Sequence, residues 1–354
     1  MNVHTEVKPE IKLEKKRSGA GSMVFVLIAV FLLIALAFTV FTPLPVSYLA
    51  RFAFRNGVAV PPENYAEIKE KTVDIKDLRY PSSYKDNLAD IYLPKDAYGP
   101  HPVILWIHGG AFVGGDKHDL DVYATTLATE GYAVVCMNYR RAPEAKYPTP
   151  VIQTGEVYEW IKSVADEYHL DENNIVLAGD SAGAHIAAQF ALVQTNPDYA
   201  AEMGIEPIVV AGAIKAMLLF CGPFDVAKIV ESDNSVFAFL MDKTAWAYFG
   251  TQSWLETAEK QATISAHLTA DFPPSFISDG NTGSFESHGR DLAEVLTSAG
   301  VPVDTYFIPS EIEVTKHEYQ FIMNTPAGEE SLKRTLNFLH KYVEGSKVAG
   351  GAEK

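Results

Sequence analysis

Cysteine is almost absent from this chain of 354 residues, which contains only Cys136 and Cys221. Both stand in apolar stretches, where such a residue usually behaves as a small buried hydrophobic side chain. Their spacing alone leaves a disulfide open. The sequence also lacks C-x-x-C and H-E-x-x-H, the ligand spacings of common zinc sites, so we expect no metal ion.

Positive charge is scarce as well. The chain has 29 Lys and Arg residues against 45 Asp and Glu, which gives a formal net charge of −16. The first 22 residues carry +2, so the rest of the chain carries −18. A body this acidic disfavours nucleic acid as a partner, because phosphate groups are drawn to basic surfaces.

A long apolar run lies near the N-terminus, where residues 23–41 read MVFVLIAVFLLIALAFTVF without a charge. A helix of this length spans about 29 Å, which matches a hydrocarbon core of about 30 Å. We interpret 23–42 as a transmembrane anchor. The alternative is a cleaved signal peptide with its site at Ala35-Leu36-Ala37, although the apolar run continues past that point. Basic residues precede the span, so we expect a cytoplasmic tail over 1–22 and an extracytoplasmic body.

The rest of the chain alternates between strand and helix patterns. Residues 43–72 are expected to form a connector with a short helix around Val46–Phe54, residues 73–342 a single α/β domain, and residues 343–354 a disordered tail. We predict strands near 73–78, 88–93, 101–108, 132–138, 174–178, 214–220, 274–278 and 301–308. We predict helices over 119–129, 155–168, 286–298 and 328–342, another from 182 onward, and a mainly helical insertion over 223–270. This alternation predicts a mostly parallel sheet flanked by helices.

The stretch Asn174–Gln194 carries the clearest chemical signal. It contains Gly179-Asp180-Ser181-Ala182-Gly183, a G-x-S-x-G between a buried strand pattern and an Ala-rich helix pattern. A serine on such a sharp turn has its hydroxyl exposed at the carboxyl end of the sheet, and the glycines leave room for the turn. We therefore predict Ser181 as a nucleophile.

A second motif supplies backbone donors. His108-Gly109-Gly110 follows the strand predicted at 101–108, and a strand that ends in glycines leaves N–H groups unobstructed. With the N–H of Ala182, those of Gly109 and Gly110 are predicted to bind the oxyanion of an acyl-transfer intermediate. The alternative is that these glycines only form a tight turn.

A serine nucleophile needs a base, and we expect His317 to fill this role. It stands between the last predicted strand and the last predicted helix, after the serine in chain order, as this strand–turn–helix arrangement requires. We expect His185, one turn into the helix after Ser181, to be packed in the interior instead.

Four motifs together resemble the α/β-hydrolase superfamily, and most closely its hormone-sensitive-lipase-type bacterial carboxylesterases. They are HGGAF at 108–112, YRRAPE at 139–144, GDSAG at 179–183 and HEYQF at 317–321. The resemblance covers residues 73–342. It implies that Ser181 is the nucleophile, His317 the base, and Gly109, Gly110 and Ala182 the oxyanion donors. Arg141 and Glu144 would be structural, and residues 223–270 would form a small helical cap.

The sequence departs from this family at the third member of the triad. The family carries an aspartate in a G-x-x-D-P-L pattern, whereas this chain has Gly283 at that position. Glu286 is our preferred acid, because its longer side chain reaches back from the first turn of a helix. Asp279 is the alternative acid. Glu286 also has a non-catalytic interpretation, because the helix dipole alone favours an acidic residue at a helix N-terminus.

Taken together, these patterns predict a membrane-anchored serine carboxylesterase that needs no cofactor and acts on small-molecule esters. We expect aromatic residues of the insertion to line an acyl pocket: Phe237, Phe239, Trp246, Tyr248, Phe249 and Trp254. Two alternatives remain open, a non-catalytic scaffold on the same fold and a peptidase or acyltransferase that uses the same nucleophile.

Overall fold

The structure is a computed structural model that describes residues 19–95, 99–231 and 234–343. The chain divides into two compact units, Met1–Pro45 and Val46–Lys354. In the first unit, helix α1 (Gly19–Phe38) begins four residues before the predicted span. It is long and apolar enough to cross a membrane, a test that signal sequences also pass, and none of its window Gly21–Phe38 is buried. The predicted tails lie largely outside the described residues.

The second unit is built on a sheet of eight strands in the order β1-β2-β4-β3-β5-β6-β7-β8. The first two are antiparallel to their neighbours, and the pairs from β4 to β8 are all parallel. Every strand expected from the sequence is present. Their bounds are β1 Thr72–Arg79, β2 Leu88–Pro94, β3 His101–Ile107, β4 Ala133–Met137, β5 Leu170–Asp180, β6 Ile214–Phe220, β7 Ser275–Asp279 and β8 Val303–Phe307.

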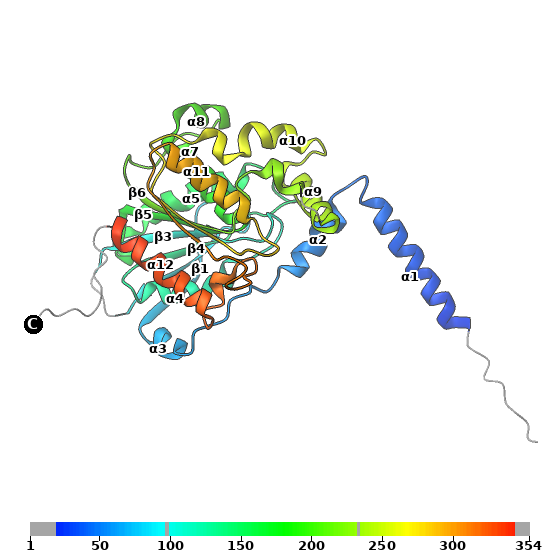
Figure 1. Cartoon of the computed structure of the whole chain (residues 1–354), viewed down its shortest axis with the longest axis horizontal. Coiled ribbons are helices and arrows are strands. Elements are labelled where there is room, and N and C mark those ends of the chain that lie inside the picture. The colour runs from blue at the N-terminus through cyan, green and yellow to red at the C-terminus, as the bar shows by residue number, and fades with distance from the viewer. Residues whose placement is uncertain (1–18, 96–98, 232–233, 344–354) are drawn as a thin grey trace, which may run out of the picture. The chain divides into compact units, whose positions relative to one another are not determined.

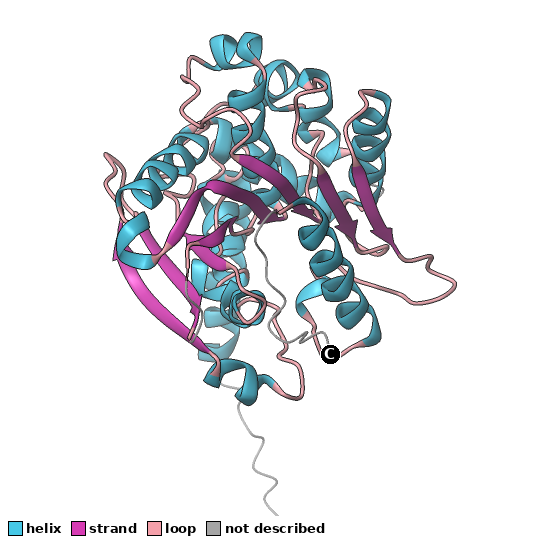
Figure 2. Cartoon of the chain, turned by 90° about the vertical axis from the view of Figure 1, so that its left-hand side faces the viewer, coloured by secondary structure: helices cyan, strands magenta, loops and turns pink. Residues whose placement is uncertain are grey.

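Helices cover both faces of this sheet (Figures 1 and 2). Helices α5, α7 and α11 share one apolar core with the sheet, and α4 and α12 share another. Strand β3 supplies Leu105 to the first core and Trp106 to the second, and all seven of its residues are buried. This two-sided burial explains why the sequence of β3 is apolar throughout instead of alternating.

The remaining bounds are as follows. The helices of the layers and their connections are α4 Asp121–Ala128, α5 Thr149–Ser163, α6 Ala165–Tyr168, α7 Ala182–Thr195, α8 Pro197–Met203, α11 Glu286–Ser298 and α12 Pro326–Tyr342, with 3-10 turns η1 Lys117–Leu120 and η5 Tyr319–Phe321. The insertion is helical as predicted and consists of η2 Val226–Val230, α9 Ser235–Phe249, α10 Trp254–Thr257, the π-helical turn η3 Ala258–Ala262 and η4 Ile264–His267.

The segment expected as a connector contains α2 (Leu44–Ala53) and α3 (Tyr65–Glu70). Arg51 of α2 binds the domain through three partners. Its Nε donates to Val113 O at 2.6 Å, its Nη2 to Ala142 O at 2.6 Å, and both its Nη atoms to Glu144 at 2.8 and 2.6 Å. The hydrogen bond from Arg51 lowers the pKa of Glu144 to about 2. Glu144 of the YRRAPE run thus holds α2 in place.

Candidate active site

Ser181 stands on the turn between β5 and α7 with φ 51° and ψ −122°, a conformation that non-glycine residues rarely adopt. The turn leaves no room for side chains beside it. A Cβ on Gly179 would lie 2.4 Å from the carbonyl carbon of Gly183, and one on Gly183 would lie 2.0 Å from Ile107 O. The two glycines of the G-x-S-x-G pattern are therefore required by the close approach of backbone to backbone.

Ser181 and His317 line the same cavity, which has a volume of about 420 Å³. Gly109, Gly110 and Ala182 line it too. The structure therefore brings together the residues that the sequence predicts as nucleophile, base and oxyanion donors, although 136 positions separate Ser181 from His317.

The oxyanion donors differ from the prediction at one position. The N–H of Gly109 donates to Asp180 Oδ2 at 2.8 Å, so this group is already engaged and the expectation for Gly109 does not hold here. Within the described ranges, the N–H groups of Gly110 and Ala111 have no hydrogen-bond acceptor. Both residues have positive φ, 108° and 51°. The N–H of Ala182, first in α7, is free of an intrahelical acceptor as well.

The imidazole of His317 is oriented by a hydroxyl. Ser284 Oγ lies 2.6 Å from His317 Nδ1 and itself donates to Asp279 Oδ1. This network assigns the imidazole proton to Nδ1, so that Nε2 is free to accept one. Burial lowers the pKa of His317 to about 4, which keeps the ring neutral, and raises the pKa of Asp279 to about 7.

Glu286, our preferred acid, has a different partner. Its Oε1 accepts from Arg290 Nε at 2.8 Å and from Nη2 at 2.6 Å, an ion pair one helical turn apart. In the described part of the chain no hydrogen bond joins Glu286 to His317. The geometry favours the alternative that the sequence analysis kept, Asp279 at the end of β7, and it adds Ser284, which the sequence analysis missed. No sequence signal marks a serine for this role.

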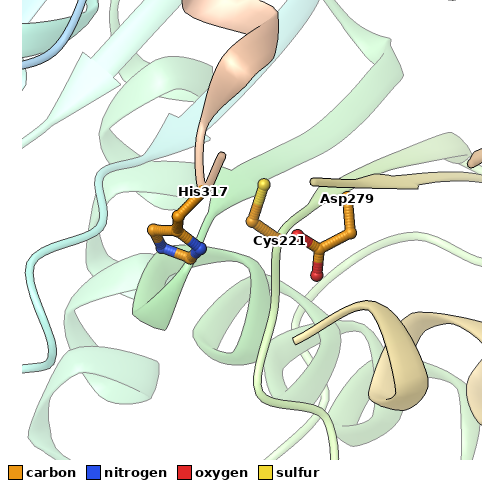
Figure 3. Close-up of side chains that lie close together, drawn as sticks. All are labelled: Cys221, Asp279 and His317. Carbon is orange, nitrogen blue, oxygen red and sulfur yellow. The ribbon is translucent and has the colours of Figure 1, made fainter. Parts of the chain in front are cut away.

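His317 belongs to a cluster of three potential metal ligands. The ligand atoms of Cys221, Asp279 and His317 lie within 4.8 Å of one another (Figure 3). Nitrogen, oxygen and sulfur are all zinc ligands, but the Ser284 hydroxyl already bridges Nδ1 and the Asp279 carboxyl, so an ion held by all three would have to displace it. Both cysteines of the chain are free and buried, as expected from their apolar surroundings, and burial raises the pKa of the Cys221 thiol.

Two neighbouring carboxyl groups connect the turn that carries Ser181 to the loop that carries His317. Asp180, which precedes Ser181, accepts from Trp106 Nε1 at 2.9 Å and from the N–H of Gly109. Glu318, which follows His317, forms a side-chain hydrogen bond with Asp180. Burial raises the pKa of both groups. Asp180 raises the pKa of Glu318 further, whereas the hydrogen bond with Glu318 opposes the rise at Asp180. The pair therefore shares a proton instead of carrying two charges.

The cap contributes fewer aromatics to the cavity than expected. Of the six predicted pocket residues only Phe237 lines it, beside the aliphatic Ile229, Leu240 and Met241. Phe239 is exposed, and Tyr248 and Trp254 are fully buried. Trp254 stacks on Phe249 with ring centroids 5.9 Å apart. Most of these rings hold the cap together, because a small helical layer needs an apolar core of its own. His185 is buried as predicted, with Nε2 2.7 Å from Ala262 O.

The sequence resembles known esterases over most of its length. A family model described as BD-FAE matches residues 89–287, more than half of the chain. Carboxylesterase NlhH of Mycobacterium tuberculosis (strain ATCC 25618 / H37Rv) is 30% identical over 300 residues, 79% of this chain and 85% of that protein. The probable carboxylic ester hydrolase LipM of the same strain is 25% identical over 264 residues, 72% of this chain but only 58% of LipM.

Solved structures share the fold. Esterase B from Lactobacillus rhamnosis (HN001) superposes with a TM-score of 0.66 at 24% identity, covering 91% of this chain and 96% of that one. A structure titled Bacterial Heroin Esterase gives a TM-score of 0.64 at 24% identity, covering 79% and 88%.

Proposed function

This chain belongs to the hormone-sensitive-lipase-like carboxylesterases of the α/β-hydrolase superfamily, and on that premise we propose that it hydrolyses carboxylic esters through an acyl-enzyme on Ser181. The observation that carries the proposal is the shared cavity: the strained turn presents Ser181 to a space that His317 and two unpaired backbone N–H groups also line.

In the proposed reaction, His317 Nε2 removes the hydroxyl proton as Ser181 Oγ attacks the ester carbonyl. The N–H groups of Gly110, Ala111 and Ala182 stabilise the oxyanion, and each such donor typically contributes about 3 kcal/mol in the transition state. The alcohol leaves with the proton from His317. A water molecule, deprotonated by the same imidazole, then releases the acid and restores Ser181. No step requires a cofactor.

We assign the role of triad acid to Asp279, acting through Ser284. His317 Nδ1 donates to Ser284 Oγ, which donates to Asp279 Oδ1. As positive charge develops on the imidazole, the chain of two hydrogen bonds passes the stabilising effect of the carboxylate to the ring. Glu286 is excluded from this role in the proposal because Arg290 holds its carboxylate.

Active-site labelling tests the proposal. We expect a fluorophosphonate probe to label the native chain and the exposed-serine control Ser253→Ala equally, and to leave Ser181→Ala unlabelled. p-Nitrophenyl butyrate hydrolysis should follow the same pattern. Labelling or turnover that survives in Ser181→Ala would refute the mechanism, and an unreactive native chain would favour the non-catalytic scaffold. Faster cleavage of peptide amides than of esters would favour a peptidase.

We propose further that α1 anchors the enzyme in a membrane with residues 1–22 in the cytoplasm and the hydrolase domain outside. The support is the uncharged run of 19 residues and the basic residues before it. Two measurements test this: resistance of the full chain to carbonate extraction, and protease digestion from the outer side. An N-terminus beginning after Ala37 in the mature protein would show a cleaved signal peptide instead.

A further inference from the structure

Helix α2 carries an unusually apolar outer face. Its inner side is buried through Val46, Ser47 and Ala50 and is held to the domain by Arg51. On the opposite side Tyr48, Leu49 and Phe52 are 48%, 67% and 60% exposed. A helix spacing of 100° per residue places these three within one arc, so they form a continuous apolar strip, which we call the α2 face.

The stretch of sequence that carries this face is basic, and Glu144 of the domain pairs with one of its two arginines, Arg51. Residues 43–62 contain Arg51 and Arg55 and no acidic residue, in a chain whose net charge is −16. Arg55 is exposed, and its guanidinium lies 4.2 Å from the ring centroid of Phe52. An aromatic ring flanked by an arginine is the arrangement that suits the boundary between acyl chains and anionic headgroups.

The covalent chain keeps the α2 face near the proposed anchor. Helix α1 ends at Phe38 and α2 begins at Leu44, so the linker is residues 39–43. Even fully extended, this linker spans only about 20 Å. If α1 spans the bilayer, α2 has to remain close to the membrane surface.

Helix α2 leads directly into a segment that lines the active-site cavity. The segment directly after α2 lines the cavity through Phe54, Asn56, Gly57 and Val58. Helix α9 also lines the cavity, through Phe237, Leu240 and Met241, while its Val236 and Phe239 are 75% and 42% exposed. Exposed apolar side chains therefore occur on α9, which lines the cavity, and on α2, which directly precedes a lining segment. Such exposed apolar surface is typical of a site that contacts lipid.

We propose that the α2 face inserts into the outer boundary of an anionic phospholipid bilayer and that the cavity opens toward the lipid. The enzyme then takes as substrates acyl esters that are dissolved in the bilayer. This inference rests on the proposed esterase function and on the proposed anchor. It predicts that substrate reaches Ser181 along a lipid surface, so hydrophobic esters need not cross water.

Depth of insertion is measured on the full chain in vesicles of phosphatidylcholine and phosphatidylglycerol at a ratio of about 4:1. Leu49→Cys and Phe52→Cys are labelled with an environment-sensitive maleimide fluorophore, since both native cysteines are buried. The matched control is Val210→Cys, a position 61% exposed in the loop after α8. We expect nitroxide lipids to quench the labels at 49 and 52 at least about 3-fold more than at 210. Equal quenching at all three would overturn the proposal.

Turnover provides the second measurement. We expect the double variant Leu49→Glu with Phe52→Glu to lose at least about 5-fold in rate on a long-chain umbelliferyl ester embedded in the vesicles. Its rate on water-soluble p-nitrophenyl acetate should match that of the native chain, and Val210→Glu should change neither rate. An unchanged rate on the embedded ester, or an equal loss on both substrates, would overturn the proposal. A native chain without esterase activity would refute the proposed function, whereas the quenching result would still decide membrane contact.

Discussion

Ser284 Oγ lies 2.6 Å from His317 Nδ1, in the position where a serine hydrolase of this fold normally presents a carboxylate. The carboxyl of Asp279 stands one hydrogen bond further away, behind that hydroxyl. Asp279 is 1% exposed and terminates β7, so it remains a buried acid at the carboxyl end of a parallel strand. In the proposed mechanism the triad therefore has an inserted fourth member, Ser284.

This relay predicts a graded series of variants. Asp279→Asn should lower kcat by about 10³–10⁴-fold, because the imidazolium loses its charge partner. Ser284→Ala should lower kcat by about 10–100-fold, since the carboxyl remains but the connection is lost. Glu286→Gln is the matched control and should stay within about 2-fold of the native rate. Steady-state kinetics with p-nitrophenyl butyrate separates kcat from KM.

The reverse order of effects would contradict the relay. A large loss of kcat in Glu286→Gln together with a small loss in Asp279→Asn would identify Glu286 as the acid, as the sequence predicts. Circular dichroism on each variant separates a catalytic effect from loss of folding.

The second prediction concerns the pH dependence of activity. Burial raises the pKa of Asp279 to about 7 and lowers that of His317 to about 4. The base is therefore neutral throughout the range from pH 5 to 9, whereas the acid becomes ionised only near neutrality. We expect kcat/KM to rise between about pH 6 and 8 and then to level off. In Asp279→Asn this rise in kcat/KM should disappear. If the rise persisted, the group that titrates would be a residue other than Asp279.

The third prediction concerns stability and the Asp180–Glu318 pair. Both pKa values are raised in the folded protein, so their contribution to stability is complete at low pH and is lost as pH rises through the folded-state values. Glu318→Gln keeps a hydrogen-bond partner for Asp180 and removes one buried acid. We expect this variant and the native chain to be about equally stable at pH 5, and the variant to be more stable by about 1–2 kcal/mol at pH 8. Urea unfolding at both pH values measures the difference, and a variant less stable at pH 8 would contradict it.

The fourth prediction concerns the attachment of α2. Arg51→Ala removes the hydrogen bonds to Val113, Ala142 and Glu144, and should lower the free energy of unfolding by about 2 kcal/mol after allowance for partial exposure. Glu144→Gln removes only the charge of one partner and should cost less. Thermal unfolding of both variants tests the order, and no loss in Arg51→Ala would show that α2 is held by its buried side chains alone.

The fifth prediction separates a cap residue that lines the cavity from a cap residue that is buried in the core of the cap. Phe237 lines the cavity, whereas Trp254 is buried in the cap and donates from Nε1 to Asp242 at 3.0 Å. Phe237→Ala should raise KM for longer acyl esters several-fold with little change in unfolding. Trp254→Ala should lower stability by about 3–5 kcal/mol. Equal effects of both changes on KM and on stability would remove this distinction.

The sequence by itself determined the layers of the fold and pointed to the two residues that we propose as nucleophile and base. Strand and helix patterns arise from residues near one another in the chain, and burial on both faces gives β3 and β5 their continuous apolar runs. The glycines around Ser181 are likewise needed for a local reason, because two backbone segments approach each other closely there. For this reason motif and chain order were enough to predict Ser181 and His317, and the two line one cavity.

Only the tertiary structure decided how these groups are connected. Glu286 was predicted as the acid because its side chain is long enough to reach toward His317. In the structure Arg290, four residues later in the same helix, binds the Glu286 carboxylate instead. Gly109 was assigned to the oxyanion hole because nothing local shows that Asp180, 71 residues later, accepts its N–H. Ser284 reaches His317 across 33 residues. Whether two distant side chains form a hydrogen bond depends on differences of a few tenths of an ångström in their separation after folding. The periodicity of the sequence does not predict such differences.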